Sequence, residues 1–321
     1  MTIGLKDIFL AHKRMQGIVK RTPFDLSPVL SELTGGEIYL KCENYQTTGS
    51  FKLRGAVNKM SALTDEEKRR GVVTASAGNH AQGVAYVARS LGIDAKVVIP
   101  ENGSKTKIAN CRRMGANVVI AGRDYDGSEV RAWEIAGEED RTYVHAFDDP
   151  LIWAGQGTIS LEMLQDVPDL DILLVPAGGG GLITGMALAA KEIHPKIKVF
   201  AIQPETSIPW YTSFKNGVYT PVEMFDSLAD GLTGDISPSM VPLFNQIIDD
   251  VFLVTEEEVA MGMYWLIHEQ QMLVEGSGAV GVSLLLSKKE ALFDVTDKKV
   301  GIVLTGRNVD TEVIKDLLNR Y

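Results

Sequence analysis

Short apolar runs alternate along the chain with longer stretches in which apolar residues recur at helical spacing. The apolar runs predict strands at Ile38–Lys41, Val72–Ala75, Ala95–Ile99, Asn117–Ile120, Thr142–His145, Asp171–Val175, Lys198–Ile202, Val251–Val254 and Val300–Leu304. The intervening stretches predict helices, among them Phe51–Met60, Ala81–Ser90, Lys105–Met114, Gly155–Gln165, Leu182–Ile193, Glu256–Gln270 and Asp310–Asn319. This alternation predicts an α/β fold with parallel sheets, in which ligands bind at the carboxyl ends of strands.

The stretch from Ile172 to Ala190 carries no charge and approaches the length of a membrane span. Pro176 and the four glycines Gly178–Gly181 interrupt it. We therefore expect a buried strand, a turn and a buried helix there, and no membrane as a partner.

Two domains are expected in a chain of 321 residues. Residues 72–145 hold four closely spaced strand–helix units, which predict a small domain at 61–148 inserted into a large domain made of 1–60 and 149–321. Residues 204–239 are rich in Pro, Gly, Ser and Thr. They form either a surface excursion or an interface element.

Composition narrows the classes of function. The net charge of −10 disfavours nucleic acid as a partner. The two cysteines, Cys42 and Cys111, have no metal-ligand spacing and are expected to be free thiols in a reducing compartment. The N-terminus lacks a basic start followed by an apolar run, so a signal peptide is not expected and the protein is predicted to be cytoplasmic.

The glycine run Gly178–Gly181 lies between a predicted strand and a predicted helix. Successive backbone N–H groups at a helix start form a cup for phosphate, whereas the alternative is a tight turn without a ligand. A dinucleotide site would need an acidic residue at the end of the next strand. Gln203 stands there, which weakens the dinucleotide reading.

A second turn, Ser76-Ala-Gly-Asn-His80, also joins a strand to a helix. Its N–H groups and side-chain donors suit a carboxylate. Taken alone, helix capping by Ser76 or Asn79 is the simpler reading.

Lys52 lies among small and apolar neighbours at the start of a predicted helix. Most lysines are solvated, but burial lowers the pKa of an amine and makes it nucleophilic, and we expect Arg54 to act in the same direction. Thr305 ends the last predicted strand, where its hydroxyl can meet the edge of a ring; the alternative is a helix-entry turn capped by Asn308 or Asp310.

Together these motifs resemble the pyridoxal-phosphate enzymes of the threonine/serine dehydratase family, of fold type II. The resemblance covers nearly the whole chain and rests on Lys41-Cys-Glu-Asn, Thr48-Gly-Ser-Phe-Lys-Leu-Arg-Gly55, Ser76-Ala-Gly-Asn-His-Ala-Gln-Gly83, Ala154-Gly-Gln-Gly-Thr158, Gly178–Gly181 and Val274-Glu-Gly-Ser-Gly-Ala279. It implies two open, twisted, mostly parallel sheets flanked by helices, with pyridoxal 5′-phosphate between a large and a small domain.

The resemblance also assigns roles to residues. Lys52 would form the Schiff base with the cofactor, and Phe51 would pack against the ring. Thr305 would face the pyridine nitrogen, and Glu275 would lie near the wall of the site. The phosphate would bind Gly178, Gly179, Gly180, Gly181 and Leu182. Asn79 would bond the 3′-oxygen, and the substrate carboxylate would bind Ser76, Ala77, Gly78, Asn79 and His80.

The implied reaction is β-elimination from L-threonine or L-serine, giving a 2-oxo acid and ammonia. Racemases of the family carry a serine where this chain has Ala77, so racemisation is expected to be poor. Gln203, Ser207 and Pro209 occupy the expected position of the divalent-cation site of racemase-like members, and we predict no metal of that kind.

Arg307 departs from the glycine common at its position. It either pairs with an acidic residue at the surface or binds a specialised substrate such as 3-hydroxyaspartate. The chain stops soon after the last catalytic turn, so the regulatory domain of biosynthetic members and feedback by isoleucine are not expected. The family implies a homodimer or homotetramer. From another class, a non-catalytic protein that binds an amino acid or a nucleotide remains an alternative.

Overall fold

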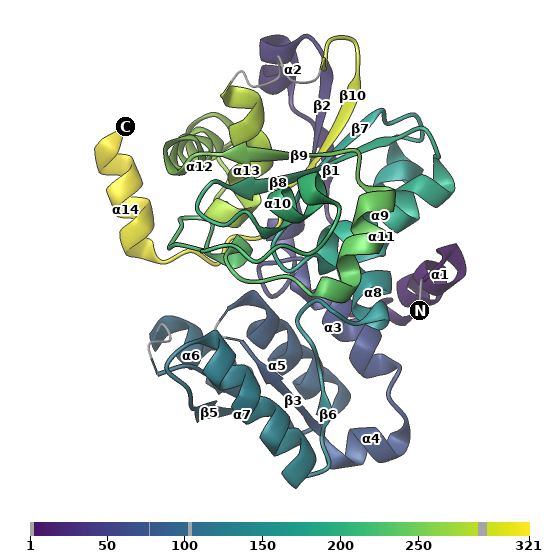
Figure 1. Ribbon diagram of the computed structural model, residues 1–321, viewed down its shortest axis with the longest axis vertical. Helices are drawn as coiled ribbons and strands as arrows, with labels where there is room; N and C mark the ends of the chain where they lie inside the picture. The colour runs from purple at the N-terminus through teal and green to yellow at the C-terminus, as the bar shows by residue number, and fades with distance from the viewer. Residues whose placement is uncertain (1–2, 77, 102–104, 288–293) are drawn as a thin grey trace.

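The computed structural model describes residues 3–76, 78–101, 105–287 and 294–321, and its strands form one sheet in each of two lobes (Figure 1). The larger sheet has the order β1-β2-β10-β7-β8-β9. It contains β1 (Phe24–Leu26), β2 (Glu37–Lys41), β7 (Ile172–Pro176), β8 (Lys198–Pro204), β9 (Asp250–Val254) and β10 (Lys299–Val303). The smaller sheet, β5-β4-β3-β6, contains β3 (Val72–Ala75), β4 (Ala95–Ile99), β5 (Asn117–Ile120) and β6 (Thr142–Tyr143).

Nearly all strand pairs of the described residues are parallel, with the antiparallel pair β1–β2 at one edge of the larger sheet. The predicted α/β class with two mostly parallel sheets is therefore confirmed. Strand β1 is an addition that the apolar pattern did not predict. All strands of the smaller sheet lie between residues 72 and 143, inside the predicted small domain, whose limits at 61 and 148 stay a prediction.

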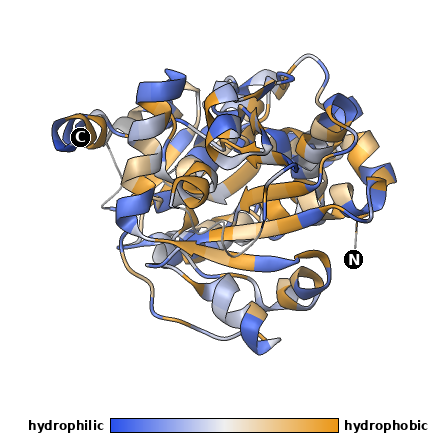
Figure 2. Ribbon diagram, turned by 90° about the horizontal axis from the view of Figure 1, so that it is seen from above, coloured by the Kyte–Doolittle hydropathy of each residue, from blue (hydrophilic) through white to orange (hydrophobic). Residues whose placement is uncertain are grey.

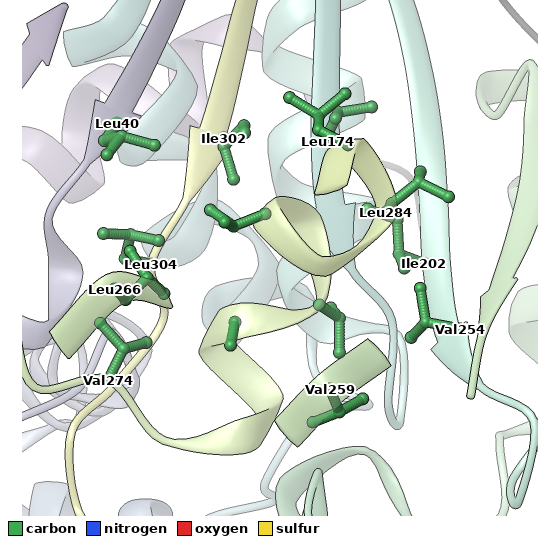
Figure 3. Close-up of a cluster of buried hydrophobic side chains, with 14 of the residues drawn as sticks. Leu40, Leu174, Ile202, Val254, Val259, Leu266, Val274, Leu284, Ile302 and Leu304 are labelled. Carbon is green, nitrogen blue, oxygen red and sulfur yellow. The ribbon is translucent and has the colours of Figure 1, made fainter. Parts of the chain in front are cut away.

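Helices cover both faces of the larger sheet. One face packs on α12 (Glu256–Gln270) and α13 (Gly276–Leu286), the other on α8 (Pro150–Asp166), α9 (Gly181–Ile193) and α11 (Val241–Ile247). Alternate strand residues point to opposite faces, so Leu174 joins the first core and Leu173 the second. Figure 3 shows Leu174, Ile202 and Ile302, from three neighbouring strands, in the same core cluster as Leu284 of α13.

The smaller sheet is covered in the same way, by α5 (Asn79–Leu91) and α6 (Lys105–Arg113) on one side and α7 (Tyr125–Glu138) on the other. Figure 2 shows the apolar residues concentrated in the central strands. The remaining helices are α1 (Leu5–Arg14), α2 (Pro28–Thr34), α3 (Lys52–Ser61), α4 (Asp65–Arg70), α10 (Pro209–Asn216) and α14 (Thr311–Arg320), with 3-10 turns at Glu43–Tyr45, Asp230–Leu232 and Pro238–Met240.

Two features of the sequence explain how well the elements were predicted. Helix α12 follows Thr255, whose hydroxyl accepts from the Glu258 N–H at 3.1 Å while the Glu258 carboxylate accepts from the Thr255 N–H at 2.8 Å. This capping box fixes the start of the helix.

The uncharged stretch 172–190 forms strand β7, a turn and most of α9, as expected. Among the helices of the described residues, none combines the length and hydrophobicity of a membrane span.

Helix α3, which begins at Lys52, is fixed by four buried charged residues that we call the buried charge cluster: Lys41, Glu43, Arg54 and Glu162. The Arg54 guanidinium donates to both carboxylates, at 2.8 Å to Glu43 and at 2.7 and 2.8 Å to Glu162. Lys41 Nζ donates to Glu162 at 2.6 Å. With two cations and two anions the cluster is neutral, which is the arrangement that buried charges require.

Candidate active site

A cavity of about 710 Å³ lies between the lobes, where strands of both sheets end. Thirteen predicted site residues line it: Phe51, Lys52, Ser76, Gly78, Asn79, His80, Gly178, Gly179, Gly180, Gly181, Leu182, Glu275 and Thr305. They come from segments as far apart in the sequence as Phe51 and Thr305. Their convergence on one cavity is the arrangement that the strand-end rule predicts for a ligand site.

Lys52 is the first residue of α3, and its Nζ donates to the Ala146 carbonyl oxygen at 3.0 Å. Burial lowers the pKa of this amine to about 8, against the opposing charge of Glu275. The expectation that Arg54 contributes is wrong, because its guanidinium turns away and pairs with Glu43 and Glu162. Burial alone makes Lys52 a usable nucleophile and base near neutral pH.

The glycine turn between β7 and α9 has no space for side chains. Gly180 has a φ of +96°, which favours glycine, and a Cβ on Gly179 would lie 2.3 Å from the ring of Phe147. Helix α9 begins at Gly181, and its first N–H groups have no partner within the helix. These groups and the positive end of the helix dipole form the cup that a phosphate needs.

The second turn, between β3 and α5, presents Ser76, Gly78 and the start of α5 to the cavity. Ser76 Oγ accepts from the Gly78 N–H at 3.1 Å. The His80 ring lies 3.0 Å from the Val144 carbonyl oxygen, and burial lowers its pKa to about 3, so the ring is neutral and structural. Ala77, which was also predicted to bind the substrate, lies outside the described residues.

Asn79 is fixed by a network and does not cap α5, whose N-cap is Gly78. Its Nδ2 donates to Glu275 Oε1 at 2.7 Å, and its Oδ1 accepts from Asn308 Nδ2 at 2.6 Å. The Asn308 N–H also donates to Glu275, at 2.9 Å. The network holds the Asn79 amide at one orientation in the cavity wall, so the simpler interpretation of Asn79 as a helix cap is wrong.

The turn after β10 is joined to the residues before Lys52. Ser50 and Gly306 form an antiparallel bridge, and the Phe51 N–H donates to the Thr305 carbonyl oxygen at 3.0 Å. Thr305 is buried and lines the cavity. The lysine and this threonine therefore belong to one rigid unit.

Arg307 is the predicted residue that the structure does not bring to the cavity wall. Its side chain is exposed, although its N–H donates to the Gly49 carbonyl oxygen at 2.9 Å. This position does not support the predicted contact with substrate. Within the described residues no ion pair of Arg307 is found either.

Several wall residues were not singled out from the sequence, among them Tyr125, Asp126, Glu129, His145, Asp148 and Ser277, whereas Asn308 was considered only as a helix cap. His145 ends a predicted strand, so the strand-end rule could have found it. The segment 204–239 was predicted to be a surface excursion or an interface element. In the structure it supplies Met224 and residues 230–237 to the cavity wall.

Within the described residues, Lys52 is the one lysine or arginine side chain that lines the cavity. Anions there must be held by N–H groups, hydroxyls and amides. At the position where the resemblance places a divalent-cation site, Gln203 Nε2 donates to the Ala177 carbonyl oxygen at 3.1 Å and Ser207 Oγ donates to the Leu232 carbonyl oxygen at 3.3 Å. No cluster of three or more metal-ligating side chains occurs in the part of the chain that the structure describes.

The family model described as "Pyridoxal-phosphate dependent enzyme" matches residues 15–306. The chain belongs to this family of pyridoxal-phosphate dependent enzymes. It is 43% identical to the L-threonine ammonia-lyase of Thermotoga maritima, covering 99% of this chain and 79% of that one. It is 40% identical to the catabolic L-threonine dehydratase TdcB of Escherichia coli K12, covering 99% and 96%. The solved structure of maize serine racemase superposes with a TM-score of 0.95, at 33% identity, covering 100% and 98%.

The cavity of this pyridoxal-phosphate dependent enzyme fits its cofactor. The Gly178–Gly181 turn leaves no room for any Cβ and can therefore face a phosphate, and Lys52 supplies a buried amine for the aldehyde. Phe51 and Thr305 line the space between them, where an aromatic ring fits. The residue types match a phosphorylated aldehyde on a pyridine ring, and the fold is that of fold type II.

Proposed function

We propose that this enzyme dehydrates and deaminates L-threonine, L-serine or both, releasing a 2-oxo acid and ammonia. The observation that carries the proposal is the half-buried Lys52, whose amine has its pKa lowered to about 8 and lies in one cavity with two anion-binding helix starts. The relatives named L-threonine ammonia-lyase and L-threonine dehydratase, similar over 99% of the chain, support the choice of substrate.

Each step uses a named group. The turn at Ser76–His80 and the start of α5 hold the substrate carboxylate. When bound, pyridoxal phosphate supplies the conjugated ring that accepts the electron pair left at the substrate Cα. Lys52 takes the Cα proton as general base, for which its lowered pKa suits it. The Asn79 amide, held by Glu275 and Asn308, fixes the plane in which the reacting groups meet.

Alternatives within the family are weaker. A racemase needs a second base on the far face of the substrate, and Ala77 cannot supply one. A 3-hydroxyaspartate dehydratase needs a cation for the second carboxylate. Arg307 is not at the cavity wall, and acidic side chains such as Asp148 and Asp230 are. The alternative from another class, a non-catalytic binding protein, does not account for a buried amine.

The test is release of 2-oxo acid by the cofactor-loaded protein from L-threonine, L-serine and L-threo-3-hydroxyaspartate. Lys52→Ala should lower turnover by at least a thousandfold, whereas the control Lys13→Ala, at an exposed position on α1, should leave it unchanged. Turnover by Lys52→Ala at the native rate refutes the assignment. If the native protein releases no 2-oxo acid from any of the three substrates, the proposed reaction is refuted.

We also propose a cytoplasmic setting and assembly into a homodimer or homotetramer. Cys42 and Cys111 are buried free thiols, and burial raises the pKa of Cys42 to about 12, which keeps it protonated. Such thiols are compatible with a reducing compartment. Light scattering of the purified protein measures the assembly directly.

A further inference from the structure

His145 lies at the cavity wall beside the turn that faces the expected substrate carboxylate. It follows β6, which pairs in parallel with β3. The preceding residue, Val144, donates its N–H to Val73 at 2.9 Å, and its carbonyl oxygen accepts from the Thr74 hydroxyl at 2.8 Å. This register places His145 next to the carboxyl end of β3, where Ser76 begins the turn.

One ring nitrogen of His145, Nδ1, is engaged by backbone N–H groups. Nδ1 accepts from the N–H groups of Phe147 at 3.1 Å and of Asp148 at 2.8 Å. A nitrogen that accepts two hydrogen bonds carries no proton, so in the neutral ring the proton is on Nε2. The turn after β6 therefore fixes both the orientation and the tautomer of His145.

The Nε2–H group is not satisfied by its carboxylate neighbour. Glu129 Oε1 lies 3.7 Å from Nε2, beyond hydrogen-bond length. The same oxygen accepts from the Tyr143 hydroxyl at 2.9 Å and the Tyr125 hydroxyl at 3.3 Å. His145 thus presents a donor to the cavity, with 22% of its side chain exposed.

The surroundings of the ring favour its neutral form. Burial lowers the pKa of His145, and the charge of Lys52 lowers it further, against the opposing charges of Glu129, Asp148 and Asp149. These are the charged groups that face the ring, from α7, α3 and the turn that follows β6. A neutral donor binds an anion without adding a second cation beside the Lys52 amine.

We propose that His145 donates a hydrogen bond from Nε2 to the α-carboxylate of the amino-acid substrate. This inference rests on the proposed function and adds a second attachment point to the turn at Ser76–His80. His145 is a binding residue and not a base, because Nδ1 is engaged by backbone and Nε2 already carries the proton. The site consequently selects substrates with a free α-carboxylate, over amides and amines.

Two substitutions separate the donor from the turn that holds it. In His145→Asn the amide oxygen can replace Nδ1 as acceptor for the backbone N–H groups, while the donor at the ε position is lost. In His145→Gln the amide nitrogen replaces Nε2. The probe is L-2-aminobutyrate, which has the carboxylate of threonine but no β-hydroxyl, and its Kd is read from the absorbance of the bound cofactor.

We expect His145→Asn to raise the Kd of L-2-aminobutyrate and the KM of L-threonine by the same factor, roughly 10- to 100-fold, with kcat within about threefold. His145→Gln should recover most of this loss. Equal losses in both variants, or a loss confined to threonine, overturn the inference. Matching cofactor content and Tm establish that the variants are folded.

A spectroscopic readout tests the tautomer independently of turnover. In protein labelled with ¹⁵N-histidine, neutral His145 should carry its proton on Nε2 and none on Nδ1, and its pKa should lie below the ordinary value of 6.5; a pKa above 6.5, or a proton on Nδ1 of the neutral ring, refutes the neutral donor. Because binding of L-2-aminobutyrate needs no catalysis, a native protein that binds it but releases no 2-oxo acid refutes the proposed reaction and leaves the test of His145 intact. A native protein that releases 2-oxo acid from threonine but does not bind L-2-aminobutyrate overturns the inference alone.

Discussion

Replacing Arg54 with methionine tests whether charge balance holds the buried charge cluster together. The side chain of Arg54 is fully buried and makes charge-assisted hydrogen bonds to Glu43 and Glu162, plus one to the Thr158 hydroxyl at 3.1 Å. Methionine has a similar length and no charge. The variant therefore leaves two buried carboxylates with Lys41 as their one cation.

The expected loss follows from that imbalance. Removing one partner of a buried ion pair costs about 3–5 kcal/mol, because the remaining charge has neither water nor a counter-charge. With an unfolding entropy of about 2.1 cal/mol/K per residue over 321 residues, this loss lowers Tm by roughly 5–7 °C. Thermal unfolding followed by circular dichroism, at fixed cofactor and protein concentration, measures it.

A double variant makes the reasoning refutable. Glu43→Gln alone leaves one cation too many, but Arg54→Met with Glu43→Gln restores a neutral cluster of Lys41 and Glu162. The double variant should therefore be more stable than either single variant. If the double variant loses as much stability as the two single variants together, charge balance is refuted as the cause. The control is Arg21→Met, which breaks an exposed ion pair with Asp166, a residue on the helix α8 that also carries Glu162. This variant should lower the free energy of unfolding by less than about 1 kcal/mol.

Two further predictions concern the cavity. Because the neutral amine alone reacts with an aldehyde, the rate of cofactor capture by the apoprotein should rise about tenfold per pH unit below pH 8 and level off above it. Glu275→Gln removes the charge that raises the pKa of Lys52 and should move the midpoint of this rate profile to lower pH. A midpoint near pH 10, as for an ordinary lysine, contradicts the argument that burial lowers the pKa. Arg307→Gly should leave the ranking of kcat/KM among threonine, serine and 3-hydroxyaspartate within about twofold because its side chain is exposed; a selective loss for hydroxyaspartate would return Arg307 to the site.

Local patterns predicted most of the fold. Helix α12 was predicted residue for residue from helical spacing, and the capping box at Thr255 explains why the helix begins where the spacing does. Strand β1 was missed because Phe24-Asp25-Leu26 is too short to show a period, and it forms only by pairing with β2. The two glycine-rich turns were found because strand, turn and helix signals follow one another directly.

Long-range contacts account for what was missed. Arg54 was expected to act on Lys52, but its partners Glu43 and Glu162 lie 11 and 108 residues away, and no local pattern pairs them. His145 stands at a predicted strand end, yet its role depends on the pairing of β6 with β3 and on the bend that returns two N–H groups to its ring.

The position of β10 sets the order in which the enzyme can mature during synthesis. This strand is the last in the chain, yet it lies between β2 and β7 and joins the two parts of the larger sheet. A nascent chain that has not released residues 299–306 lacks both this junction and the bridge of Gly306 to Ser50. Lys52 leaves the ribosome early but reaches its working position only after residues 299–306 have emerged and paired, so cofactor capture has to wait for this strand.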